Sequence, residues 1–179
     1  MKHVGITMAL AAIVATPLAA QQAPAPAGVR GEILAQFNDA AQKLEQLAEA
    51  IPQDKFTWRP GTGVRSVSEV FLHVAGSNQY LLTALGVPST MRGEDDLEKS
   101  TTDRAQVLAK LKEANAAVRA AILKMSDADL DKATKLFGMD MTYRGVAIAL
   151  ESHVHEHLGQ MIAYARTNGV VPPWSRTGQ

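Results

Sequence analysis

Apolar residues recur every three or four positions in four stretches of the chain, which is the spacing of an amphipathic helix. The first stretch covers residues 31–51 and stops at Pro52. Its apolar positions are Ile33, Phe37, Ala40, Leu44, Leu47 and Ile51. The other three stretches are residues 66–85, 102–125 and 142–168. This pattern predicts four long helices.

Capping and stop signals support these boundaries. Ser66 and Glu69 have the spacing of a capping box, and Gly86 is a helix stop. Gly169 ends the last stretch in the same way, and two prolines follow it. Residues 52–65 and 86–100 are predicted loops, and residues 126–142 a connector with a short turn or strand. With four amphipathic helices and no clear sheet, the sequence predicts an all-α fold, a four-helix bundle.

The N-terminal residues 1–20 have the pattern of a secretory signal peptide. A short basic start precedes an apolar core from Val4 to Val14, too short for a permanent membrane span, and small residues lead to a cut after Ala20. An uncleaved anchor is the alternative. Residues 21–28 are a flexible Pro/Ala linker, so residues 29–179 form the folded domain. We expect export to the periplasm or medium, without stable membrane insertion after cleavage.

Composition narrows the chemistry further. The chain has 18 basic and 18 acidic residues and only 5% aromatics, so neither charge nor base stacking favours a nucleic-acid partner. There are no cysteines, which excludes disulfides, thiolate zinc sites and a cysteine nucleophile. A metal would have to bind through histidine, carboxylate, amide or water.

Three of the five histidines lie within five positions of the fourth helix. A helix turns by about 100° per residue, so His153 and His157 share one face while His155 points the other way. We expect His155 to be solvated or at an interface. Ile148 and Ile162 lie on its side of the helix, which indicates burial between helices or a homodimer contact.

His73, in the second helix, could provide a third imidazole for His153 and His157. Three histidines with open coordination positions are typical of a catalytic metal site. Zn²⁺ and Ni²⁺ are the expected ions, and Mn²⁺ and Fe²⁺ are alternatives. The competing interpretation is a group of hydrogen-bonded core histidines that binds no metal.

Three further residues are candidates for supporting or acid–base roles. Gln160 lies on the face of His153 and His157, while Glu69 and Tyr80 lie one turn before and two turns after His73. Each has a structural alternative: Glu69 as a helix cap, Tyr80 as a packing residue and Gln160 as a buried amide.

Several motifs resemble those of the DinB/YfiT-like metalloenzymes. They are "HVHEHLGQ" around the histidine pair, "FTWRPGTGVRSVSEVFLHVAG" around His73, and "AYARTNGVVPPW" after the last helix. The resemblance implies a four-helix bundle with a divalent metal on His73, His153 and His157. The chain departs from the family pattern at Leu158, where the family often has arginine. Members with an assigned activity are thiol-dependent transferases and isomerases.

Two classes of function follow. The first is an exported metal-dependent enzyme that performs hydrolysis or thiol transfer on a small molecule. The second is a non-catalytic bundle that a metal stabilises or that binds a small apolar or haem-like ligand.

Overall fold

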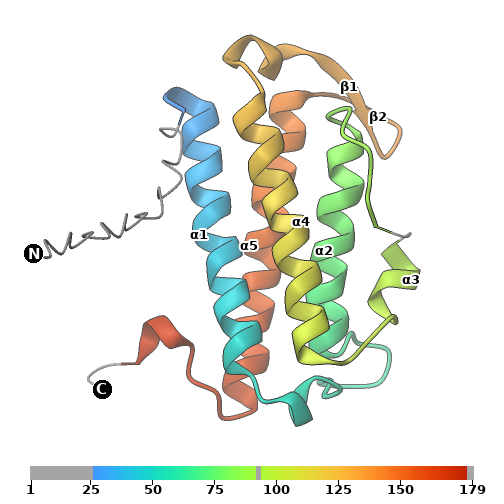
Figure 1. The fold of residues 1–179 in the computed structure, drawn as a ribbon, viewed down its shortest axis with the longest axis vertical. Helices are drawn as coiled ribbons and strands as arrows, with labels where there is room; N and C mark the ends of the chain where they lie inside the picture. The colour runs from blue at the N-terminus through green and yellow to red at the C-terminus, as the bar shows by residue number, and fades with distance from the viewer. Residues whose placement is uncertain (1–25, 92–93, 177–179) are drawn as a thin grey trace, which may run out of the picture.

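Four long helices form the body of the molecule, as the sequence predicts (Figure 1). The computed structural model describes residues 26–91 and 94–176. The four bundle helices are α1 (Gly28–Ala50), α2 (Val67–Thr83), α4 (Arg104–Lys124) and α5 (Tyr143–Thr167). The shorter elements are η1 (Gln53–Lys55), α3 (Glu94–Glu98), η2 (Asp127–Asp131), β1 (Ala133–Leu136), β2 (Met139–Thr142) and η3 (Pro173–Ser175).

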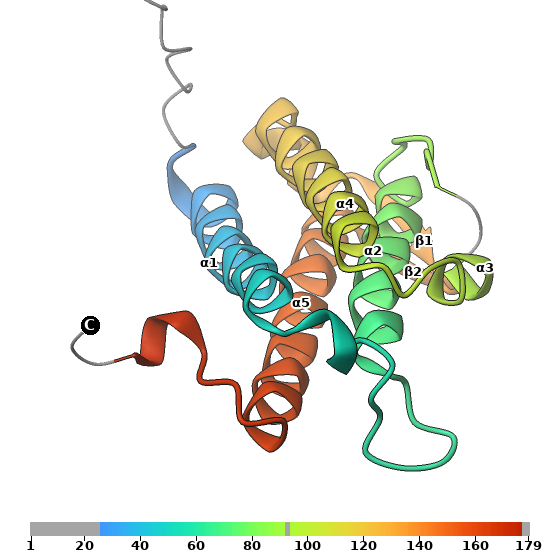
Figure 2. The same cartoon turned by 60° about the horizontal axis from the view of Figure 1, so that its bottom comes forward.

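The order of the helices around the bundle differs from their order in the chain. Helix α1 packs against α4 and α5, and α2 packs against the same two helices. Helices α2 and α4 run in the same direction, because the chain returns along the bundle between them (Figure 1). This return carries α3, which packs on the outer side of α2 (Figure 2).

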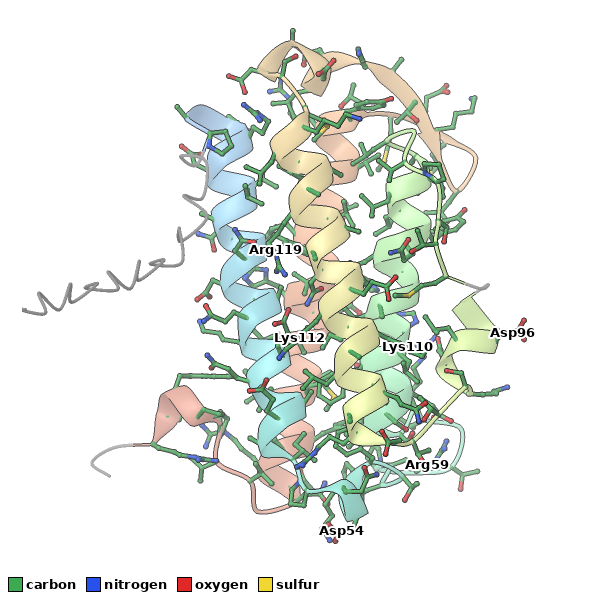
Figure 3. All side chains as sticks on the ribbon, viewed as in Figure 1. Asp54, Arg59, Asp96, Lys110, Lys112 and Arg119 are labelled. Atoms are coloured by element: carbon green, nitrogen blue, oxygen red, sulfur yellow. The ribbon has the colours of Figure 1, made fainter. Side chains whose placement is uncertain are left out.

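The core is made of the apolar positions that recur along the four helices. Large side chains with essentially no exposed surface fill it: Phe37, Phe56, Phe71, Leu44, Leu47, Leu72, Leu111, Ile122, Leu150 and Met161. Charged side chains such as Asp54, Asp96 and Lys112 lie on the outside (Figure 3). This division follows from the low cost of exposing charges and the gain from burying apolar surface.

The helix signals in the sequence act as predicted. The Ser66 hydroxyl accepts a hydrogen bond from the Glu69 amide at 3.4 Å, and the Glu69 carboxylate accepts one from the Ser66 amide at 2.7 Å. This capping box fixes the start of α2. Gly86 and Gly169 follow α2 and α5 with φ of +76° and +74°, the left-handed conformation of a helix stop.

One predicted loop contains a helix that the sequence does not indicate, and the connector 126–142, predicted to hold a short turn or strand, contains both. Residues 86–100 were expected to be a polar loop, yet they include α3. A helix of five residues is too short to show an apolar period. The connector 126–142 contains η2 and a β-hairpin. The hairpin turn is Phe137–Gly138, an unusual pair for this position, so the sheet gave little signal in the sequence.

The predicted signal peptide, residues 1–20, and most of the predicted linker lie outside the described residues. Helix α1 begins at Gly28, the last residue assigned to that linker. Among the described residues, no helix is both long enough and apolar enough to cross a bilayer.

Candidate metal site

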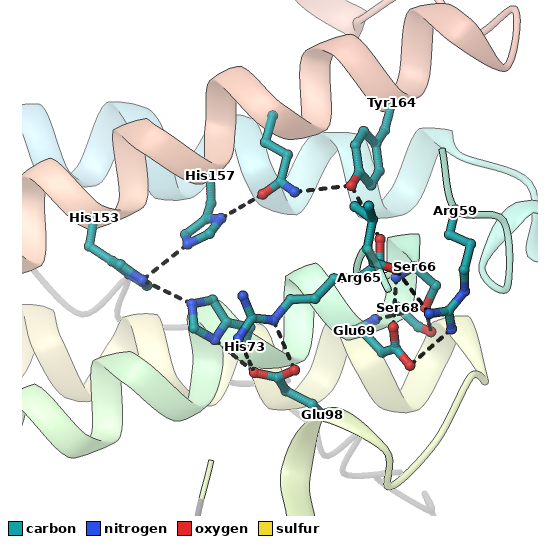
Figure 4. A network of polar contacts seen from close by, with 12 residues as sticks. Arg59, Arg65, Ser66, Ser68, Glu69, His73, Glu98, His153, His157 and Tyr164 are labelled. Carbon is teal, nitrogen blue, oxygen red and sulfur yellow. Dashed lines mark hydrogen bonds and ion pairs between the residues drawn. The ribbon is translucent and has the colours of Figure 1, made fainter. Parts of the chain in front are cut away.

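Three imidazoles point toward one another between α2 and α5 (Figure 4). His73 extends from the middle of α2, while His153 and His157 extend from α5, one turn apart. The Nε2 atom of His153 lies 3.2 Å from Nε2 of His73 and 3.1 Å from Nε2 of His157. The structure therefore brings together the three histidines that the sequence singled out as metal ligands.

The outer nitrogen of His73 is held by a carboxylate from α3. The Nδ1 atom lies 2.8 Å from Oε1 of Glu98. Arg65 donates to both oxygens of the same carboxylate, at 2.9 and 3.0 Å. Burial raises the pKa of Glu98, but hydrogen bonds from Arg65 and His73 outweigh it, so the pKa lies below its ordinary value. The ionised carboxylate can only accept, so Nδ1 of His73 donates and Nε2 keeps its lone pair.

The outer nitrogen of His157 is fixed by a chain of hydrogen bonds. The Tyr164 hydroxyl donates to the Arg65 carbonyl at 3.2 Å, so it accepts from the Gln160 amide nitrogen at 3.0 Å. That leaves the Gln160 oxygen facing Nδ1 of His157 at 2.8 Å. Nδ1 of His157 must therefore carry the proton, and Nε2 again keeps its lone pair. Gln160, one of the predicted supporting residues, holds a site histidine directly.

Burial keeps the paired histidines uncharged. It lowers the pKa of His153 to about 3, and a positive charge on His157, His73 or Arg65 acts in the same direction. Burial also lowers the pKa of His157, against the opposing hydrogen bond to Gln160. Neutral imidazole is the form that binds metal ions.

The arrangement of donors fits a divalent metal ion. The Nε2 lone pairs of His73 and His157 both face Nε2 of His153, and one proton on that atom cannot bridge both well. A cation at their centre would accept electron density from all three nitrogens. Within the described residues, Nδ1 of His153 is buried without a hydrogen-bond partner, so no neighbour fixes this ring as Glu98 and Gln160 fix the others.

The sequence places the chain in a family independently of this geometry. Residues 36–161 match the family described as the DinB superfamily. The chain belongs to the DinB superfamily. A search of curated proteins found no match.

Solved structures share the fold of this DinB superfamily protein. A DinB-like protein from Bacillus cereus is 19% identical, with a TM-score of 0.71, over 81% of this chain and 95% of its own. YfiT from Bacillus subtilis is described as a probable metal-dependent hydrolase with an unusual four-helix bundle topology. It is 16% identical, with a TM-score of 0.63, over 86% of this chain and 97% of its own.

Glu69 has its contacts at the start of α2. Besides capping the helix, its carboxylate forms an ion pair with Arg59 at 3.1 Å. Burial raises the pKa of Glu69, but hydrogen bonds from Ser66 and Arg59 outweigh it and lower the pKa. These contacts support the capping interpretation of Glu69.

Tyr80 and His155 lie in different surroundings. Tyr80 lines a cavity of about 450 Å³ that also reaches His73 and His153. His155 is half-buried on the opposite side of α5, where Nδ1 lies 2.9 Å from the Glu151 carboxylate. His155 is thus separate from the histidine group of this DinB superfamily protein, as its position in the helix predicts.

Glu98 and Arg65 were missed in the sequence. Both lie in segments predicted as loops, where no periodicity says which way a side chain points. The one available signal is Leu97, a single apolar residue in a polar stretch, which is buried and anchors α3 beside α2.

Proposed function

We propose that this DinB superfamily protein is a metal-dependent hydrolase that acts on a small molecule. One divalent ion is bound by the Nε2 atoms of His73, His153 and His157. The observation that carries the proposal is that these three atoms converge, while Glu98 and Gln160 hold the protons of two rings on the outward Nδ1 atoms. The description of YfiT as a probable metal-dependent hydrolase supports the same reaction class.

The number of protein ligands favours catalysis over a structural metal. A structural zinc site commonly has four protein ligands, whereas a catalytic site has three and keeps a position for water or substrate. The carboxylate that contacts the histidine group, Glu98, is engaged by Arg65 and His73. We therefore assign Glu98 to orienting His73 and not to binding the metal.

When bound, the divalent ion supplies Lewis-acid chemistry, because it polarises a substrate oxygen and lowers the pKa of water. The chain's residues supply the rest. Glu98 and Gln160 fix the tautomers of His73 and His157, and burial keeps His153 neutral. Tyr80 is the acid–base candidate that lines the cavity, so we assign it the contact with substrate.

The donor set also favours particular ions. Three imidazoles without a carboxylate suit zinc or nickel better than the oxygen-preferring ions magnesium and calcium. Manganese and iron are the next candidates. Protein loaded separately with each ion would rank them by affinity and by activity.

Export is a second part of the proposal. Its support is the sequence of residues 1–20, with a basic start, an apolar core and small residues before the cut. Intact mass of the protein from its native compartment would test it. A chain that begins at Gln21 supports export, and an intact Met1 in the cytosol contradicts it. A homodimer contact on α5 is a further part of the proposal, and the exposure of Ile148 supports it.

Hydrolysis is tested by comparing matched histidine variants. Metal-loaded protein would be assayed against a panel of esters, amides and lactones, alongside His157→Ala and His155→Ala. We expect turnover by the wild type and by His155→Ala, and none by His157→Ala. Equal activity in all three would exclude the site as its source. Metal binding without turnover of these substrates, or of thiol acceptors, would instead assign a non-catalytic metal-stabilised bundle.

A further inference from the structure

The cavity beside the histidines has an aromatic outer wall. Tyr80 from α2 and Phe137 from the hairpin turn stack with ring centroids 5.4 Å apart and planes 24° from parallel. Both line the cavity that reaches His73 and His153. Tyr80 is 44% exposed and Phe137 68% exposed, so the pair lies at the mouth while the less exposed histidines lie deeper.

The position of Phe137 costs backbone energy. Its φ is +52°, and Gly138 follows with φ of +78°, so both turn residues are in the left-handed region. This two-residue turn favours asparagine or glycine at the first position, and a bulky residue there is strained. Strain of this kind concentrates at functional sites. The turn places an aromatic ring on Tyr80 where asparagine would satisfy the backbone better.

The remaining wall consists of apolar residues, the two serines Ser77 and Ser152, and a single charged residue. Leu81 and Ala149 add apolar surface, and Glu156 on α5 is the one charged side chain that lines the cavity among the described residues. Lys135, in the first strand of the hairpin, forms an ion pair with Asp140 at 2.5 Å and does not line the cavity. A carboxylate beside aromatic faces attracts cations and repels anions.

We propose that this cavity selects small molecules with a flat apolar group and a neutral or positive polar group, which bind against Phe137, Tyr80 and Glu156 while the rest of the molecule extends toward His73 and His153. This inference rests on the proposed function, because it names the substrate class of the same site. The volume of about 450 Å³ suits a small molecule of one or two rings.

Three probes of similar size and different charge test the selectivity: phenyltrimethylammonium, benzyl alcohol and benzenesulfonate. None is a strong metal ligand, but a divalent ion in the site would repel the cation and attract the sulfonate, so the probes are compared at equal metal occupancy, with the metal-free and the zinc-loaded protein. Affinity would be measured by NMR titration of the full protein. We expect the cation to bind about tenfold more tightly than the sulfonate, the size of a cation–π contact aided by one carboxylate. Benzyl alcohol should lie between them.

Variants locate the binding. Phe137→Asn removes the ring and suits the turn, so the fold should be kept while the affinity for phenyltrimethylammonium falls about tenfold. Met139→Thr changes an exposed apolar residue of the same hairpin outside the cavity and should leave the affinity unchanged. Glu156→Gln should lower the affinity for phenyltrimethylammonium and reduce the difference between its affinity and that of benzenesulfonate.

Equal binding of the three probes, or an unchanged affinity in Phe137→Asn, would overturn this inference. The two proposals fail separately. Loss of metal binding with retained probe selectivity would reject the metal site alone. A bound metal with activity but no preference among the probes would reject the aromatic cavity alone.

Discussion

Two groups of polar side chains lie inside this bundle, and α2 contributes to both. On the side of α2 that faces α4, the Asn78 amide donates to the Asn115 oxygen at 3.0 Å, and Asn115 donates to Glu45 of α1 at 2.8 Å. On the side that faces α5, His73 meets His153 and His157. Both groups sit among apolar core residues, and both would be costly if left unpaired.

The groups differ in how their polar atoms are matched. In the amide group each amide nitrogen donates to an acceptor, while the Asn78 oxygen has no partner among the described residues. In the histidine group the donors point outward to Glu98 and Gln160, and nitrogen lone pairs point inward. A group that satisfies itself holds helices together, whereas a group with converging lone pairs is built to bind something else.

The largest expected effect is the loss of zinc affinity when His153, but not His155, is replaced by alanine. A structural zinc site binds its ion with roughly 10–16 kcal/mol, which is about 3 kcal/mol for each of four ligands. Loss of one imidazole in His153→Ala should therefore lower the zinc affinity more than about a hundredfold. His155→Ala, two residues away on the outer face, should bind as the wild type does. Competition titration with a chromophoric chelator measures both. Similar losses in the two variants would place the metal elsewhere.

Next in size is the effect of Glu98, which orients His73. Loss of such a carboxylate typically lowers metal affinity by about 10–100-fold, which is the change we expect for Glu98→Ala. Asp96→Ala, in the same short helix but exposed, is the control and should change little. The same titration applies. Wild-type affinity in Glu98→Ala would mean that His73 needs no orienting partner.

The amide group should show the opposite behaviour. Asn115→Ala leaves Asn78 and Glu45 without their partner and should lower the free energy of unfolding by about 1–3 kcal/mol. Because these atoms are not metal ligands, zinc stoichiometry should remain that of the wild type. Urea denaturation with chelator present and metal analysis of the same sample test both halves. A variant that keeps its stability but loses zinc would reverse the roles assigned to the two groups.

The last expected effect is a dependence of stability on pH. The pKa of His153 is about 3 in the folded protein and near 6.5 in the unfolded chain, so between these values the unfolded state binds more protons. The free energy of unfolding of metal-free protein should therefore decrease as pH falls from 7 to 5. The lowered pKa of His157 adds to this in the same direction.

Urea denaturation at several pH values, with His153→Phe as the comparison, measures this effect. The variant lacks the titrating ring, so its free energy of unfolding should change less with pH. Equal slopes for the two proteins would show that His153 does not titrate as burial requires.

The helices and the histidine pair of α5 were predictable because they follow a period, whereas the third histidine, His73, was assigned from the resemblance and from its place in the second helix. Apolar spacing located the four helices, and the four-residue step placed His153 and His157 on one face. Partners outside a periodic element were not predictable. Glu98 reaches His73 only because the chain returns along α2, and Phe137 reaches Tyr80 only through a two-residue turn. Such contacts depend on tertiary structure, which local spacing does not encode.

The central claim is that His73, His153 and His157 bind one divalent ion. It is tested most directly by elemental mass spectrometry of the protein purified without a histidine tag from its native compartment. We expect close to one equivalent of a transition metal per chain, with zinc or nickel foremost. Protein without metal, even after zinc, nickel, manganese and iron have each been offered, would contradict it and leave the three histidines as core residues.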